Sequence, residues 1–188
     1  PSEPLPLPLR PGSMVSIEKF ELQAIVDRLR ADGYQTIMPR VADGAVVYEE
    51  ANDVAGWPIG VVDEQDGGSY RLRAAEEAGY FDYVVGPHSI KQFLFRPQET
   101  VLQGDRIDGQ WQFSAPQHAD RPLAVIGVRA CDLHALAIQD QVFLEGPWTD
   151  ANYKARREQL FLIAVNCRRA AATCFCHSME AGPAVTED

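Results

Sequence analysis

PLAVIGV at residues 122–128 and LFLIAVN at residues 160–166 are the two runs that decide the fold of this chain. Each has the length and composition of a buried strand. Between them, residues 132–143 repeat apolar side chains at helical spacing, and the polar segment 150–159 also favours a helix. Strand, helix, helix and strand in this order predict a parallel βαβ unit whose strands are covered on both faces. The side chains expected on the sheet-facing side of the first helix are Leu133, Leu136 and Val142.

The N-terminal half of the chain is predicted to be rich in strands. Ser16 can cap a helix that Gly33 ends, with apolar residues at helical spacing between them. We therefore expect an α/β fold, with a mixed sheet, a C-terminal βαβ-like unit that carries the cysteines, and a strand-rich N-terminal half. The short β-prone runs lie at 34–39, 45–49, 70–74, 80–85 and 110–114, and a short helix is expected over 89–95.

The first fifteen residues differ from the rest of the chain in composition. Five prolines, at positions 1, 4, 6, 8 and 11, favour polyproline II and exclude a helix or a central strand. We expect residues 1–15 to be a flexible leader and residues 16–188 to form a single α/β domain. A proline-rich ligand for an aromatic groove is the functional alternative for the leader.

The composition excludes several classes of partner. The 188-residue chain is 46% hydrophobic and 23% charged, which is ordinary for a globular protein. Lys and Arg total 17 against 27 Asp and Glu, giving a formal charge of −10, which argues against nucleic acid or an anionic membrane as partner. No run approaches the ~20 apolar residues that span a bilayer, and no basic region precedes an apolar run as in a secretory signal. We expect a cytoplasmic protein.

All four cysteines lie in the C-terminal unit: Cys131, Cys167, Cys174 and Cys176. Cys131 follows the first apolar run and Cys167 directly follows the second. Because the carboxyl ends of parallel strands meet at one edge of a sheet, these two should converge beside the loop that holds the other two. Four thiolates at one rim suit a tetrahedral metal or a cubane cluster, and a helix N-terminus would favour the thiolate of Cys131. The predicted site spans residues 127–183.

Other interpretations of the cysteines stay open. Cysteine is often a plain core residue, although grouping at two strand ends argues against that, and a cytoplasmic location disfavours disulfides. Structural zinc usually uses C-x₂-C pairs, which are absent, but His134 and His177 could complete a zinc site. Cys131 could also be a nucleophile at a helix N-terminus with His134 or His177 as its base.

Polar residues flank the predicted ligands and could donate hydrogen bonds to the sulfurs of a cluster, which would tune its reduction potential. Each also has an ordinary interpretation as a surface charge or a helix cap. The segment 86–91 could line the cluster pocket or a partner face, or simply begin a helix. No phosphate-binding glycine loop or Rossmann fingerprint is present, so NAD(P) binding is unsupported. The candidates are Arg129, Asp132, His134, Asn166, Arg168, His177 and His88.

Several runs around the cysteines resemble a known family. They are GVRACDLHALAIQDQVF (127–143), AVNCRR (164–169) and TCFCHSMEAGP (173–183), and the resemblance continues in PIGVVDEQDGGSYRLR (58–73) and VVGPHSIKQFLFRP (84–97). These runs resemble the iron–sulfur β subunits of cytosolic nickel–iron hydrogenases, also called sulfhydrogenases. A related component of anaerobic sulfite reductases is similar.

The resemblance implies an electron-transfer subunit with one [4Fe–4S] cluster bound by the four cysteines. Its implied partners are a flavin subunit that handles NAD(P)H and a catalytic hydrogenase or reductase subunit. Family members usually carry a two-cluster ferredoxin module at the C-terminus. This sequence stops at Asp188 before such a cysteine run, so it resembles the N-terminal portion. Ala130 also stands where the family commonly has Pro.

Overall fold

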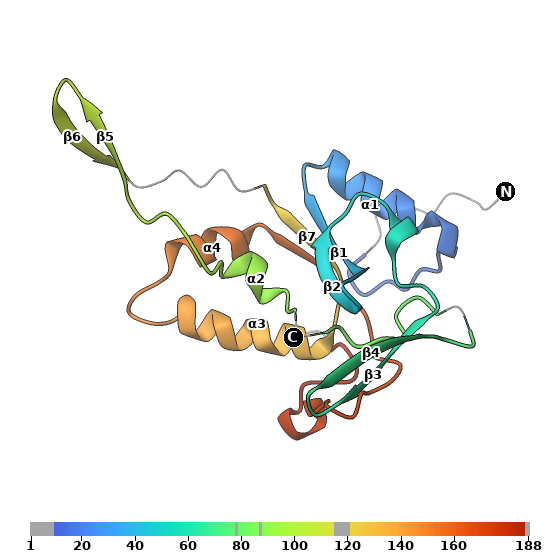
Figure 1. Ribbon diagram of the computed structural model, residues 1–188. Coiled ribbons are helices and arrows are strands. Elements are labelled where there is room, and N and C mark those ends of the chain that lie inside the picture. The colour runs from blue at the N-terminus through green and yellow to red at the C-terminus, as the bar shows by residue number, and fades with distance from the viewer. Residues whose placement is uncertain (1–9, 78, 87, 115–120, 187–188) are drawn as a thin grey trace.

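A four-stranded mixed sheet forms the centre of the computed structural model, which describes residues 10–77, 79–86, 88–114 and 121–186 (Figure 1). The strand order is β2-β1-β7-β8. The pair β1–β2 is antiparallel, whereas β1–β7 and β7–β8 are parallel, so the predicted mixed α/β fold is confirmed. The strands are β1 (Gln35–Ala42), β2 (Ala45–Glu50), β7 (Leu123–Val128) and β8 (Leu160–Ala164).

Helices cover both faces of this sheet (Figure 1). Leu123 and Val125 of β7 pack with side chains of α2, α3 and α4, while Ala124 and Ile126 pack with α1 on the other face. All of β7 is therefore buried, which explains its unbroken apolar run. The helices are α1 (Leu22–Ala31), α2 (Lys91–Leu94), α3 (Ala130–Phe143) and α4 (Ala151–Glu158).

The βαβ unit forms as predicted, with two corrections. The strand β8 is the last in the sheet and Phe161 is 44% exposed, so β8 is not covered as β7 is. On α3, Leu136 is buried, but Val142 is 63% exposed. Val142 follows Leu136 by six residues, which places it about 120° away from Leu136 around the helix. Phe143 follows by seven residues and therefore returns to the side that faces the core.

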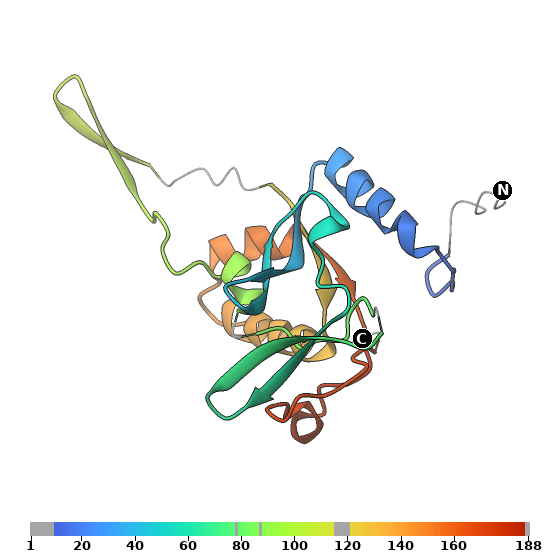
Figure 2. The same cartoon turned by 45° about the vertical axis from the view of Figure 1, so that its right-hand side comes forward.

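The N-terminal half confirms the predicted helix and most of the predicted strands. The helix is α1, preceded by the short 3₁₀ helix η1 (Lys19–Glu21). The predicted cap at Ser16 is wrong, because Glu18 is the N-cap of η1 and α1 begins only at Leu22. The strands β3 and β5 were not predicted, because their sequences are too polar to indicate strands. Each pairs with the next strand in an antiparallel hairpin. The hairpin β5–β6 extends away from the rest of the structure (Figures 1 and 2). The hairpin elements are β3 (Val61–Asp66), β4 (Ser69–Ala74), β5 (Gln103–Ile107) and β6 (Gln110–Ser114), and η2 (Val54–Gly56) precedes β3.

The predicted strand over 80–85 is wrong. Side chains, rather than a neighbouring strand, satisfy its backbone: the Arg129 guanidinium donates to the carbonyls of Phe81 and Tyr83, and Val84 N–H donates to the buried Asp63 carboxylate. The aromatic and β-branched composition of the run favours a strand locally, but these long-range contacts hold it as an irregular segment.

Most of the predicted leader lies outside the described residues. Residues 10–15 are exposed and contain no helix or strand. Within the described ranges, no helix is both long enough and apolar enough to cross a membrane.

Candidate functional site

The four cysteines lie around the edge where β7 and β8 end. Cys131 is the second residue of α3, which begins directly after β7, and Cys167 lies three residues after β8. The thiols influence one another in pairs: the charges of Cys167 and Cys176 act on Cys131, and those of Cys174 and Cys176 act on Cys167. Each of the other three predicted ligands is therefore within electrostatic range of Cys167.

The Cys131 thiol differs from the expectation of an activated thiolate. Desolvation by the surrounding protein atoms, followed by the charges of Asp132, Cys167 and Cys176, raises the pKa of this solvent-accessible thiol to about 11. The start of a helix does favour a thiolate, but here desolvation and the neighbouring negative groups outweigh it. At neutral pH the free thiol is protonated, which weakens the interpretation of Cys131 as a nucleophile.

The C-terminal segment closes one side of the cysteine group. Cys167 N–H donates to the Pro183 carbonyl at 3.2 Å, and Ala181 N–H donates to the Cys176 carbonyl at 2.9 Å. Gly182 lies between them at a φ of +146°, and a Cβ added there would lie 3.4 Å from the Cβ of Ala130. The 3.4 Å distance is an ordinary contact, so it is the positive φ that favours glycine at this position.

The hairpin β3–β4 supports the loop that carries Cys167, Cys174 and Cys176. The Arg169 guanidinium donates to the Asp63 carbonyl at 2.8 Å, and the Thr173 hydroxyl donates to Gln65 Oε1 at 2.7 Å. In Figures 1 and 2 the red C-terminal segment lies beside this hairpin. Sequence reasoning missed these supports, because no local pattern links residues more than 100 positions apart.

Within the loop, the Cys174 sulfur accepts a hydrogen bond from the Ala171 N–H at 3.3 Å, and Cys174 N–H donates to the Ala171 carbonyl at 3.0 Å. The thiol is therefore held by its own turn. Backbone N–H donors of this kind stabilise a thiolate and tune a metal that it binds.

Arg129 and Asp132 lie at the same edge, as predicted. The Arg129 side chain is 3% exposed and donates to the carbonyls of Phe81, Tyr83 and Asn166 at 3.0, 2.9 and 3.2 Å. The Asp132 carboxylate accepts from Arg129 N–H at 3.1 Å and so caps α3. Burial raises the pKa of the Asp132 carboxyl, and the bond and charge of Arg129 oppose that rise.

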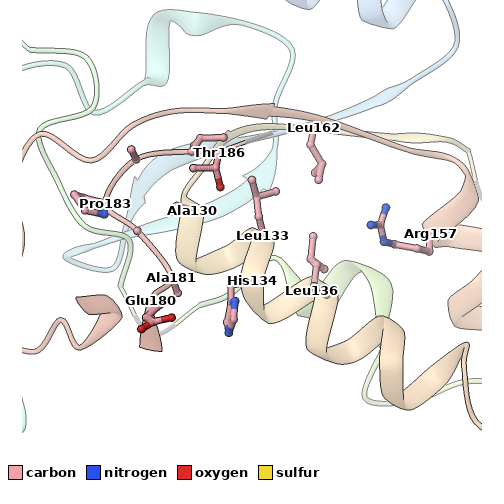
Figure 3. A pocket seen from close by; sticks show the side chains of 14 residues that line it. Ala130, Leu133, His134, Leu136, Arg157, Leu162, Glu180, Ala181, Pro183 and Thr186 are labelled. Atoms are coloured by element: carbon pink, nitrogen blue, oxygen red, sulfur yellow. The ribbon is translucent and has the colours of Figure 1, made fainter. Parts of the chain in front are cut away.

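The predicted histidines are not all at the cysteine edge. His134 lines a cavity of about 560 Å³ between α3 and the segment 180–186, where Figure 3 shows it beside Glu180. His177 is exposed on the turn η3 (Cys176–Met179), next to a predicted ligand. His88 lines a different pocket, beside β2, with Asp43 and Glu49, so the structure does not bring it to the cysteines.

Of the other flanking residues, Asn166 contributes its carbonyl to Arg129 and its side-chain oxygen to Val185 N–H at 2.7 Å. Arg168 is 68% exposed and forms an ion pair with Asp82 at 3.3 Å. Asn166 therefore joins the two segments that enclose the cysteines, while Arg168 is a surface charge.

The donors fit a thiolate-bound metal or cluster in their chemistry. All four cysteines are free of disulfides; Cys167 and Cys176 are half-buried, and Cys131 and Cys174 are exposed. As they stand, no three His, Cys, Asp or Glu side chains of the described residues are arranged to hold a metal ion. The structure thus supplies sulfur donors in one place without itself showing a closed ligand set.

Part of this chain is similar to a hydrogenase subunit. Over 94 residues it is 29% identical to sulfhydrogenase 2 subunit beta of Pyrococcus furiosus. The aligned region covers 47% of this chain and 25% of that protein. The chain therefore spans about a quarter of the length of the curated relative that it matches. No family model matches the chain, and no solved structure matches it. The similarity supports the relationship to sulfhydrogenase β subunits that the motifs predict.

Proposed function

We propose that this chain is an iron–sulfur electron-transfer part of a hydrogenase-type complex, in which Cys131, Cys167, Cys174 and Cys176 bind one [4Fe–4S] cluster. The gathering of four free thiols at the carboxyl edge of parallel strands carries this proposal. The partial similarity to sulfhydrogenase 2 subunit beta supports it. When bound, such a cluster accepts and gives up single electrons.

The chain's own contribution is to hold the sulfurs and to tune them. Cys131 is placed by α3, which packs on the sheet. The loop with the other three cysteines is held to β3 by the hydrogen bonds of its own residues Arg169 and Thr173. Because Cys131 and Cys174 are exposed, the site lies at the surface, where a redox partner can approach closely.

The partners and the compartment belong to the same proposal. We infer a flavin subunit that handles NAD(P)H on one side of the electron path and a catalytic hydrogenase or reductase subunit on the other. A cytoplasmic location fits four cysteines that are free of disulfides, because reducing compartments keep thiols in this form. The likeness to a component of anaerobic sulfite reductases rests on the sequence motifs alone.

A zinc-stabilised interaction module is the second candidate. The observation that favours it is the position of His177, directly after Cys176 and exposed on η3, where an imidazole could replace one thiolate as ligand. His134 lines the cavity next to the same edge.

Serine and alanine variants separate these candidates. After anaerobic reconstitution, Cys131→Ser and Cys176→Ser should lose most of the bound iron and sulfide, whereas His134→Ala and His177→Ala should keep both. Iron, zinc and acid-labile sulfide are measured on each purified variant. Loss of metal in His177→Ala, with zinc retained in Cys131→Ser, would contradict the cluster proposal and favour the zinc module.

A further inference from the structure

Arg129 is a buried cation whose hydrogen-bond partners are backbone carbonyls. Its side chain is 3% exposed, and its terminal nitrogens donate to Phe81, Tyr83 and Asn166. The Nε atom is buried without a hydrogen-bond partner among the described residues. Burying a charge is unfavourable unless a charge of opposite sign lies near it.

Two neighbours of the Arg129 side chain belong to the cysteine edge. The Asp132 carboxylate is bonded to the backbone N–H of Arg129, and its charge interacts with the Arg129 side chain. The other neighbour is the segment that carries Cys167: the Arg129 guanidinium donates to the carbonyl of Asn166, the residue before Cys167, at 3.2 Å. The guanidinium is therefore held at the edge that carries Cys131 and Cys167.

The orientation of this guanidinium is fixed. The rings of Phe81 and Tyr83 lie 5.8 and 5.6 Å from its central carbon, in the range of a cation–π contact. The bond to the Asn166 carbonyl joins the end of β7 to the segment that follows β8, one residue before Cys167. One side chain thus links the two strand ends that carry Cys131 and Cys167.

We propose that Arg129 is the positioning residue and counter-charge of the cysteine site. Four thiolates leave a bound cluster with a net negative charge, which grows on reduction, and a fixed cation beside it stabilises the reduced state. Arg129 then raises the reduction potential of the cluster and holds Cys131 and Cys167 at their spacing. This inference rests on the proposed function.

The test compares Arg129→Gln, Arg129→Lys and Arg168→Gln in the full chain after anaerobic reconstitution. Arg168→Gln is the matched control, because Arg168 also adjoins Cys167 but is exposed and paired with Asp82. The midpoint potential is measured by optical redox titration. Arg129→Gln should shift the reduction equilibrium about tenfold toward the oxidised state, which is about 59 mV for one electron. Arg129→Lys, which keeps the charge, should shift it less, and Arg168→Gln least.

Equal potentials in Arg129→Gln and Arg168→Gln would overturn the inference. If Arg129→Gln retains no cluster, Arg129→Lys decides the question. A retained cluster whose reduction equilibrium lies within about threefold of that of the wild type supports the counter-charge. Loss of the cluster in Arg129→Lys overturns it. A wild-type chain that binds no iron or sulfide overturns the proposed function together with this role. A wild-type cluster whose potential is insensitive to Arg129 overturns this role alone.

Discussion

The buried side chains of Tyr48 and Tyr83 differ in whether the hydroxyl group has a hydrogen-bond partner. The Tyr48 hydroxyl donates to the Gly127 carbonyl at 2.9 Å, whereas the Tyr83 hydroxyl is buried with no hydrogen-bond partner among the described residues. Tyr48→Phe should lower the free energy of unfolding by about 1 kcal/mol, and Tyr83→Phe should leave it unchanged or raise it. Urea unfolding of the two variants checks this, and an equal loss in both would contradict it.

The same Tyr48 hydroxyl predicts a pH dependence. Burial, followed by the charge of Asp132, raises its pKa well above the ordinary value of 10.0. The folded chain then keeps a proton that the unfolded chain loses, so this contribution to stability is complete below about pH 10 and is lost as the pH rises further. Thermal unfolding between pH 7 and 11 should show the gap between wild type and Tyr48→Phe narrowing above pH 10. A constant gap would argue against this assignment.

At the residue scale, sequence reasoning placed Arg129 and Asp132 with the cysteines because they are neighbours of Cys131 in the chain. It could not identify Arg169 or Thr173 as supports, since their partners lie on a hairpin distant in sequence. It also included His88, which resembles a site residue only in being a histidine beside Gly and Pro; its pocket is beside β2. The role of the cysteines as ligands remains a prediction.

Among the elements, β7 depends on one glycine. Gly127 has a φ of +91° at a break in the pairing with β8, and a Cβ there would lie 3.1 Å from Cε1 of Phe81. Gly127→Ala should lower the free energy of unfolding by about 1–3 kcal/mol, because both the backbone conformation and the space oppose it. Gly146→Ala is the control, since its nearest atom is 3.6 Å away. Chemical denaturation measures both, and similar losses would refute the explanation.

The loop with three cysteines should depend on its support by β3–β4. Arg169→Ala removes the bond to the Asp63 carbonyl, worth roughly 1 kcal/mol, so the amides of residues 170–176 should exchange with solvent about fivefold faster. Hydrogen–deuterium exchange of the apo chain measures this, with Arg168→Ala as the control. Unchanged exchange in Arg169→Ala would mean that other contacts hold the loop.

The elements that could be predicted are those with strong local signals. The two apolar runs and the helix between them lie in one stretch, so β7, α3 and β8 followed from periodicity. The segment 80–85 was misread as a strand because the groups that bind its backbone, on Arg129 and Asp63, are distant in sequence. The polar strands β3 and β5 gave too weak a pattern to be recognised.

At the scale of the whole molecule, the fold brings a site together that the chain order separates. The sheet order β2-β1-β7-β8 places an N-terminal strand beside the βαβ unit, and this pairing joins residues 88 positions apart, as in Gln35 with Leu123. The α/β class follows from composition and periodicity, whereas the strand order does not, because it depends on long-range packing of two apolar faces.

The central claim, that the four cysteines bind one cluster, is tested most directly by the metal and acid-labile sulfide content of the wild-type chain purified without oxygen, together with its optical spectrum. The account predicts about four iron and four sulfide per chain, with visible absorption that bleaches on reduction. One zinc per chain without sulfide, or neither metal after anaerobic reconstitution, would contradict it.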